Sequence, residues 1–321
     1  MSITSEINRI NTNISNAYTQ AENKGATIPQ NQNSSNLADT IQSIPRASLS
    51  NGLCFSNTTN NNFNWLLDVD ISNLTSTSGM FSNCENLTTI PLINTENIQD
   101  MEGMFSSSRS FTTVPLINTG NVTNMESMFS GCNALTTVPV LNTSKVTNMK
   151  NMFSGCAQLT TVPQIDTSKV TDMNNIFSYC SNLTTIPLLN MSAVTDAGFM
   201  FNYCTNLTSI PQLNTGEVLN MACMFSNCQS LTTIPLLNTS KVTNMNATFQ
   251  NCYALTSIPQ LDTGAVTTMT SMFAYCGNLT TIPLIDTSNV LEMGGLFRNC
   301  TNLTSVPLLN TSKVTRNGVN V

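Results

Sequence analysis

The sequence predicts an α/β solenoid, a body made by stacking 24-residue coils, preceded by a short helical segment. The stretches MFSGCNALTTVP at 128–139 and MFSGCAQLTTVP at 152–163 nearly repeat each other, and phenylalanine keeps the same step from Phe81 to Phe297. A fixed period in the twenties is typical of solenoids, whose repeats bury their apolar faces only against their neighbours. Proline follows the same period, at Pro91, Pro115, Pro139, Pro163, Pro187, Pro211, Pro235, Pro259, Pro283 and Pro307.

The repeat unit divides the chain into three parts. The unit can be written L-T-T-[IV]-P-x-[LI]-[ND]-T-[SG]-x-V-T-x-M-x-x-M-F-x-x-C-x-x. We expect a helical attachment segment at 1–45, a linker and N-terminal cap at 46–62, and the solenoid at 63–321. Its first coil, at 63–86, keeps the apolar positions but lacks the proline, and its last coil stops at Val321.

Each coil is expected to contain a strand and a helix. In the coil 135–158, the run LTTVP joins β-forming residues to a proline and predicts a short strand that stacks in parallel on its neighbours. The spacing of Val146, Met149, Phe153 and Cys156 suits a short helix capped by the preceding Thr-Ser pair. A second extended segment at Val146–Met149, with helix only at 150–155, is the alternative.

The cysteines indicate packing rather than chemistry. One position of the repeat holds nine of the eleven, and Ser108 takes that position in a further coil. Free cysteine behaves as a small hydrophobic residue, and the chain has neither histidine nor a CxxC pair, so we predict no metal or cofactor site. The nine are Cys84, Cys132, Cys156, Cys180, Cys204, Cys228, Cys252, Cys276 and Cys300.

An Asn or Asp follows the strand of every coil, where we expect it to bond the backbone of the next coil. A calcium ladder is the alternative, but only three of the ten carry charge, and calcium sites usually need several charged oxygens. The ten are Asn94, Asn118, Asn142, Asp166, Asn190, Asn214, Asn238, Asp262, Asp286 and Asn310.

Charge and composition exclude several function classes. Charged residues make up 9% of the chain and the formal net charge is −6, which argues against nucleic acid as a partner. The start, MSITSEINRINTN, carries no apolar export region, and no run of 18 apolar residues predicts membrane insertion. Without histidine, Ser–His and Cys–His catalysis are excluded.

Carboxylates are the remaining candidates for catalysis. They occupy one variable position of the repeat, at Asp100, Asp172, Asp196 and Glu292, and a glycosidase would need two of them paired in a cleft. The same position is Asn or Thr in other coils, which fits a solvated face better than an active site. We therefore expect no catalytic residues and no enzyme.

The N-terminal helix carries a heptad stripe. Its members are separated alternately by four and three residues, and such a narrow apolar stripe predicts packing against partner helices. Isoleucine at both apolar positions of the heptad favours a homotrimer. The alternative is an amphipathic helix packed back on the solenoid cap. A second short helix is expected at Ser35–Ile44. The stripe consists of Ile3, Ile7, Ile10, Ile14, Ala17 and Ala21.

Aromatic side chains at variable positions are the candidate ligand contacts. Tyr179, Tyr203 and Tyr275 share one position, Tyr253 lies two residues later in its own coil, and Phe199 interrupts an otherwise polar position. Tyrosines among Asn, Ser and Thr suit sugar recognition, since a ring offers a stacking face and the polar groups bond hydroxyls. The alternative is that the tyrosines only cover the turn beneath them.

The repeat resembles the BspA-like class of bacterial leucine-rich repeats, over about three quarters of the chain. The motifs that carry the resemblance are L-T-x-[IV]-P, [ND]-T-S-x-V-T-x-M and M-F-x-x-C in successive coils. The resemblance implies a right-handed solenoid and a class known from surface proteins, adhesins and phage-encoded proteins.

The first forty-odd residues resemble N-terminal segments of tail-associated virion proteins from phages of Gram-positive bacteria. This resemblance implies a non-enzymatic virion protein bound to other tail or baseplate proteins, which presents the solenoid to a host surface glycan or protein. A bacterial cell-surface adhesin or protein-interaction protein, located on the cell surface rather than the virion, is one alternative. A purely structural virion decoration protein is the other.

Overall fold

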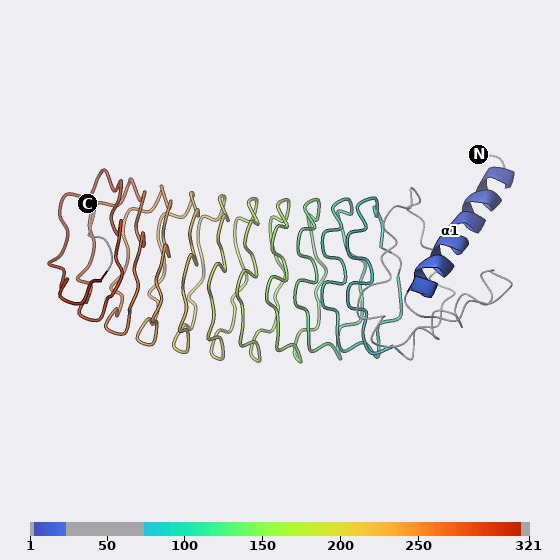
Figure 1. The fold of residues 1–321 in the computed structure, drawn as a ribbon, viewed down its shortest axis with the longest axis horizontal. Helices are drawn as coiled ribbons and strands as arrows, with labels where there is room; N and C mark the ends of the chain where they lie inside the picture. Colours follow the sequence, from blue (N-terminus) through green and yellow to red (C-terminus); the bar gives the residue numbers. More distant parts are fainter. Residues whose placement is uncertain (1–2, 24–73, 91, 316–321) are drawn as a thin grey trace.

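The computed structural model describes residues 3–23, 74–90 and 92–315. It contains one helix, α1 (Ile3–Asn23), and a solenoid whose coils lie side by side as a row of narrow loops, with α1 at the N-terminal end (Figure 1). Coil positions are numbered here from the leucine of LTT, so that Leu135 is position 1 and Gln158 is position 24 of coil 135–158.

One ladder of isolated parallel β-bridges joins the coils at position 14, from Ser76 to Glu292. Towards the preceding coil, the amide of Thr147 donates to the carbonyl of Thr123 at 2.9 Å. Towards the following coil, the amide of Met125 donates to the carbonyl of Asn148 at 3.0 Å. The extended part of each coil is therefore the V-T-x-M segment, in agreement with the alternative stated for Val146–Met149.

The predicted strand at LTTVP does not form, although its second residue bonds the preceding coil, as the amide of Thr136 does to the carbonyl of Thr112 at 2.9 Å. Among the described residues, this segment has a single bridge, between Thr113 and Thr137. Proline has no amide hydrogen, so a ladder through LTTVP would lose a rung in every coil, whereas V-T-x-M offers an amide at each residue.

The predicted helix within each coil is also wrong, because α1 is the only helix in the described part of the chain. Position 17 and position 21 have left-handed backbone, as at Asn151 (φ 55°) and Gly155 (φ 75°). These reversals aim alternate amides along the solenoid axis, so that the amide of Gly155 reaches the carbonyl of Ser178 in the next coil at 2.7 Å. The amides between them close tight turns, as from Met152 to Met149 at 3.1 Å. A run of overlapping turns thus replaces the helix.

The core is a set of columns, each made by one repeat position. Phenylalanine rings at position 19 stack from Phe81 to Phe297, with neighbouring ring centroids 5.5–5.8 Å apart. The cysteines form a second column, and the Cys156 thiol donates to the carbonyl of Phe129 in the preceding coil at 3.1 Å. Ser108 makes the same bond to Phe81 with its hydroxyl. Position 22 therefore needs a small donor, which both residue types supply.

The second half of the heptad stripe is buried within this chain. Ala17 and Ala21 are buried and Ile14 is half-buried, all in the same apolar cluster as the first coils. This burial favours the alternative in which α1 packs back on its own chain. Ala17 and Ala21 are then covered within the chain and do not contribute to a trimer interface. The side chains of Ile3, Ile7 and Ile10 lie outside the described residues, as do the helix predicted at 35–44 and the boundaries at 45 and 62.

Candidate functional site

The three tyrosines of position 21 share an unusual backbone conformation. Tyr179, Tyr203 and Tyr275 have φ angles of 60°, 59° and 64°, and Phe199 at position 17 has 57°. Left-handed backbone favours Gly and Asn, and a bulky side chain there costs on the order of 1–3 kcal/mol. Asn or Gly fills position 21 in most other coils, as at Asn227, so the fold does not require the aromatics. Such strain is typical of functional positions.

Two of the tyrosines form an exposed stack. The rings of Tyr179 and Tyr203, on adjacent coils, have centroids 4.7 Å apart and planes inclined by 9°. Their side chains remain 53% and 40% exposed, and Phe199 on the same coil as Tyr203 is 37% exposed. The structure therefore stacks two of the five predicted contact residues and leaves a third, Phe199, exposed on the coil of Tyr203; we call these three residues the aromatic edge.

The other two predicted contact residues have different surroundings. Tyr275 lies under the guanidinium of Arg298, 5.7 Å from its ring centroid. The hydroxyl of Tyr253 lies 3.4 Å from the amide oxygen of Asn251. Neither is part of the aromatic edge.

A second candidate surface is a groove that the sequence analysis missed. Positions 6–9 of successive coils line an open groove of about 1220 Å³, from Gln164 to Asp262. A further hollow of about 580 Å³ continues it to Asn310. The signal was present in position 6, which follows the proline and is aliphatic or glutamine in every coil that has the proline.

Aliphatic side chains stand exposed along this groove. Leu188, Leu236 and Leu284 are 60%, 61% and 68% exposed, and glutamines alternate with them in the intervening coils. The side-chain amide of Gln164 donates to the carbonyl of Leu188 at 2.8 Å, so the glutamine is fixed across to the next coil. The result is a rigid rim on which leucines point to solvent.

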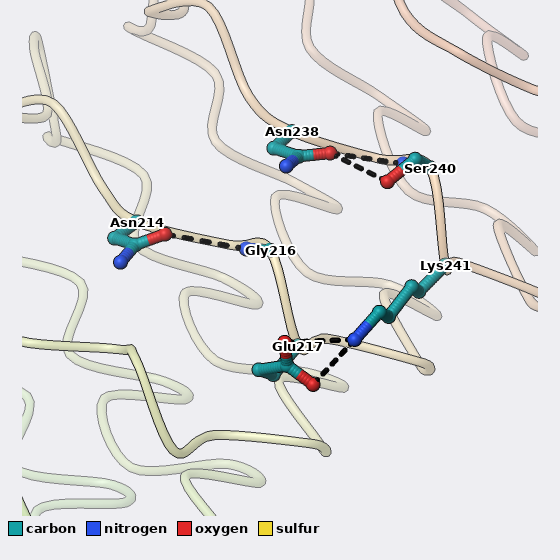
Figure 2. Close-up of polar contacts among 6 residues, drawn as sticks. All are labelled: Asn214, Gly216, Glu217, Asn238, Ser240 and Lys241. Atoms are coloured by element: carbon teal, nitrogen blue, oxygen red, sulfur yellow. Dashed lines mark hydrogen bonds and ion pairs between the residues drawn. The ribbon is translucent and has the colours of Figure 1, made fainter.

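The other rim of the groove is built from Asn and Asp turns. The side chain of Asn214 accepts from the amide of Gly216, and that of Asn238 accepts from the amide of Ser240 at 3.2 Å (Figure 2). The prediction that these residues bond the next coil is therefore wrong, because the bond closes the residue's own turn two residues on. Below this rim, Lys241 pairs with Glu217 of the preceding coil at 2.6 Å.

One acidic turn residue illustrates the electrostatics of this rim. The backbone amide of Ser168 donates to Asp166 at 2.9 Å. This bond, then the Ser168 hydroxyl, and then nearby Lys169 lower the pKa of the Asp166 carboxyl below its usual value. The groove thus carries ionised carboxylates at neutral pH.

Buried threonines, not the Asn and Asp side chains, connect the coils at this turn. The Thr167 hydroxyl donates to the carbonyl of Asn190 at 2.8 Å and accepts from its amide at 2.8 Å. Thr263 forms the same pair of bonds with Asp286, at 2.9 and 2.7 Å. The sequence carried the signal, since position 9 is threonine in every full coil with a proline except at Met191.

The chemically reactive groups are used by the repeat itself. The Asp172 carboxylate accepts from the amide of Asn174 at 2.8 Å, and Asp196 accepts from the amide of Gly198 at 2.8 Å and from Asn220 at 3.0 Å. These carboxylates close turns within the coil ladder rather than face a cleft. No cluster of three or more metal-ligating side chains occurs among the described residues.

The thiols are protonated and shielded. Burial raises the pKa of the Cys180 and Cys252 thiols to about 12, against an ordinary value of 9.0. Since the thiolate is the reactive form, these cysteines are inert at neutral pH. Within the described ranges, no helix combines the length and apolar character that crossing a bilayer would take.

A family model covers most of the chain. The family described as "Mycoplasma protein of unknown function, DUF285" matches residues 52–161, 136–234 and 230–319. The chain belongs to this family. A sequence comparison of this DUF285 member with curated proteins finds no match.

Solved structures similar to the DUF285 chain include bacterial leucine-rich repeat proteins. That of T. pallidum is 21% identical, with a TM-score of 0.36, over 60% of this chain and 76% of that one. One from Eubacterium ventriosum is 18% identical, with a TM-score of 0.41, over 74% and 83%. A leucine-rich cell surface protein from Faecalibacterium prausnitzii is 18% identical, with a TM-score of 0.28, over 72% and 76%. These values are too low to assign a function by likeness.

Proposed function

We propose that the chain is a non-enzymatic recognition protein of the leucine-rich repeat type, which presents its solenoid to a macromolecular partner at a bacterial surface. The exposed aliphatic rim of the groove carries this proposal. Large apolar side chains arranged contiguously on a surface are typical of interaction sites, because exposing them to water is unfavourable.

The shape of the groove supports a large partner rather than a small substrate. It extends over the coils that contain Gln164, Leu188, Gln212, Leu236 and Gln260, and it is open along its length. Small-molecule sites are usually enclosed and bury most of their ligand. An open rim with regularly spaced leucines suits an extended partner instead.

The chemistry of the site supports binding over catalysis. The carboxylates of Asp172 and Asp196 close turns, and burial keeps the Cys180 and Cys252 thiols protonated. An enzyme would need a nucleophile or a paired acid and base that face a cleft.

Two hypotheses place the protein differently, one on the bacterial cell surface and the other on a virion. The repeat motifs favour a bacterial surface protein. The virion hypothesis rests on the resemblance of the first forty-odd residues, most of which lie outside the described part of the chain, and it stays a prediction.

Immunogold electron microscopy on intact, non-permeabilised producing cells tests the location, with an antibody against the solenoid. Gold on the cell surface is the expected result. Gold on released particles with bare cells would instead support the virion hypothesis, and no gold on either the cells or the particles, although the cells contain the protein, would overturn both.

A photo-crosslinking amino acid at position 236, in place of Leu236, tests the groove in the full-length protein. The matched control carries it in place of Thr208, which is exposed but outside the groove. We expect a discrete adduct of higher mass from irradiated cells with the crosslinker at 236 and none at 208. Equal adducts at both positions, or none at either, would contradict a partner in the groove.

A further inference from the structure

We propose that Tyr179 forms the floor of a binding site for a neutral pyranose ring. The inference rests on the proposed recognition role but concerns another part of the coil, positions 17–21 rather than 6–9.

Side chains at position 21 project towards the preceding coil. A Cβ atom placed on Gly155 would lie 3.3 Å from the Cα of Gly131, and one placed on Gly131 would lie 3.4 Å from the Cα of Ser107. Tyr203 follows the same geometry, because its ring stacks on Tyr179 of the preceding coil. By the same direction, Tyr179 projects towards Gly155.

The two glycines leave one face of the Tyr179 ring uncovered. Tyr203 covers the other face at 4.7 Å. Position 21 of the preceding coil is Gly155, which has no side chain to cover the ring, and Gly131 precedes it. Tyr179 is accordingly more exposed than Tyr203, at 53% against 40%. The result is an open slot between the free face of the Tyr179 ring and the backbone of Gly155.

The surroundings of this slot are polar and almost free of charge. Positions 16–21 of the three coils that end at Gln158, Asn182 and Asn206 contain one lysine, Lys150, and no carboxylate. Hydroxyl and amide groups dominate, including half-buried Ser154 and Asn175. A ring face for apolar C–H groups, flanked by neutral donors and acceptors, matches an uncharged sugar and offers nothing to pair with a phosphate or a carboxylate.

The residue type at position 21 supports a ligand role, because the left-handed backbone there is common to the coils and an aromatic side chain occurs there in only three of them. Position 21 accepts Asn and Gly in other coils without an aromatic, so two consecutive left-handed tyrosines are not needed for stacking the coils. Phe199, also left-handed and exposed, lies four residues before Tyr203 on the same coil.

The test is binding of the full-length protein to an array of neutral oligosaccharides, with sialylated and uronic-acid glycans alongside. Two variants probe the slot. Tyr179→Asn removes the ring and introduces the residue that Asn227 and Asn251 already provide at this position. Gly155→Asn fills the slot and leaves the ring in place. The matched control is Tyr275→Asn, at the same repeat position beside Arg298.

We expect wild type to bind at least one neutral glycan, and both slot variants to weaken that binding about tenfold or more, as loss of a ring stack would. Tyr275→Asn should change the affinity less than about twofold. No binding to any neutral glycan, or equal binding by all three variants, would overturn the inference, as would selective binding of the acidic glycans. The groove crosslink at position 236 distinguishes the two proposals: if it forms while the wild-type protein binds no neutral glycan, only the sugar site fails.

Discussion

The cysteine column predicts that this protein unfolds sharply in alkaline solution. Burial raises the pKa of seven thiols, at Cys132, Cys156, Cys180, Cys204, Cys228, Cys252 and Cys276, far above the ordinary 9.0. Below pH 9 both the folded and the unfolded thiols are protonated, and the column contributes its full stability. Above pH 9 the unfolded thiols ionise while the folded ones cannot, so the free energy of unfolding falls as pH rises.

The magnitude follows from linkage. Each thiol that stays protonated only in the folded state removes about 1.4 kcal/mol per pH unit above its unfolded pKa. Seven such thiols together remove about 10 kcal/mol per pH unit, which is comparable to the whole stability of a typical folded domain. We therefore expect unfolding within roughly one to two pH units above 9.

Guanidinium unfolding followed by far-ultraviolet circular dichroism, from pH 8 to pH 11 with a reductant present, measures this decline. The control variant carries Cys156→Ser and Cys204→Ser, which keep a donor at position 22, as Ser108 does naturally, but introduce no thiol that titrates in this range. The free energy of unfolding of this variant should fall less steeply than that of wild type. The difference between the two slopes should be about 3 kcal/mol per pH unit, the contribution of the two thiols removed. Thiolate absorbance near pH 9 from more than the four cysteines outside this set of seven, while the circular dichroism remains native, would refute the role of the column.

Two further predictions concern the contacts between coils. Thr167→Val keeps the shape of the side chain but removes both bonds to Asn190, so we expect it to lower the free energy of unfolding by about 2–4 kcal/mol, while Thr167→Ser keeps most of the stability. Equal stability of the two variants would contradict the role of the hydroxyl. Gly198→Ala places a Cβ 3.1 Å from Asp196 Oδ1 and 2.9 Å from Asn220 Nδ2, and the disturbed bonds should cost about 1–3 kcal/mol. Thermal unfolding measures this loss, and Ala222→Gly, at the same position of the next coil, should change the stability less.

The repeat period and the core were predictable from the sequence because burial follows the period directly. Phe153, Cys156 and Leu135 recur every 24 residues, and each is fully buried. No knowledge of backbone geometry is needed for that inference, since a side chain that every coil keeps apolar must face its equivalent in the next coil.

Backbone geometry was less predictable. The apolar spacing from Val146 to Cys156 is compatible with a helix, but the left-handed residues at Asn151 and Gly155 exclude one. Their positions hold mainly Gly, Asn and Ser in other coils, and this restriction is the signal that could have indicated the turns. The proline of LTTVP led to a wrong strand prediction for a similar reason. It marks the end of an extended segment, but it does not show whether that segment forms β-bridges with neighbouring coils.

The candidate site was predicted only in part. Variation between coils identified Tyr179, Phe199 and Tyr203, since a position that departs from the repeat is free of core packing. The groove was missed because position 6 varies between aliphatic residues and glutamine, and this variation alone does not show that the aliphatic side chains are exposed along one groove. Only the fold shows that Leu236 points outward.

The columns of stacked side chains also determine how such a protein can change in length. Each lateral contact joins a fixed pair of repeat positions on neighbouring coils, so a chain that gains or loses a whole 24-residue unit within the regular part meets the same neighbours as before. A gain or loss of any other size would bring unlike positions together and place a threonine or an asparagine where a phenylalanine ring belongs. Length is therefore adjustable only in whole coils, and each added coil lengthens the groove by one rim residue without any redesign of the interior.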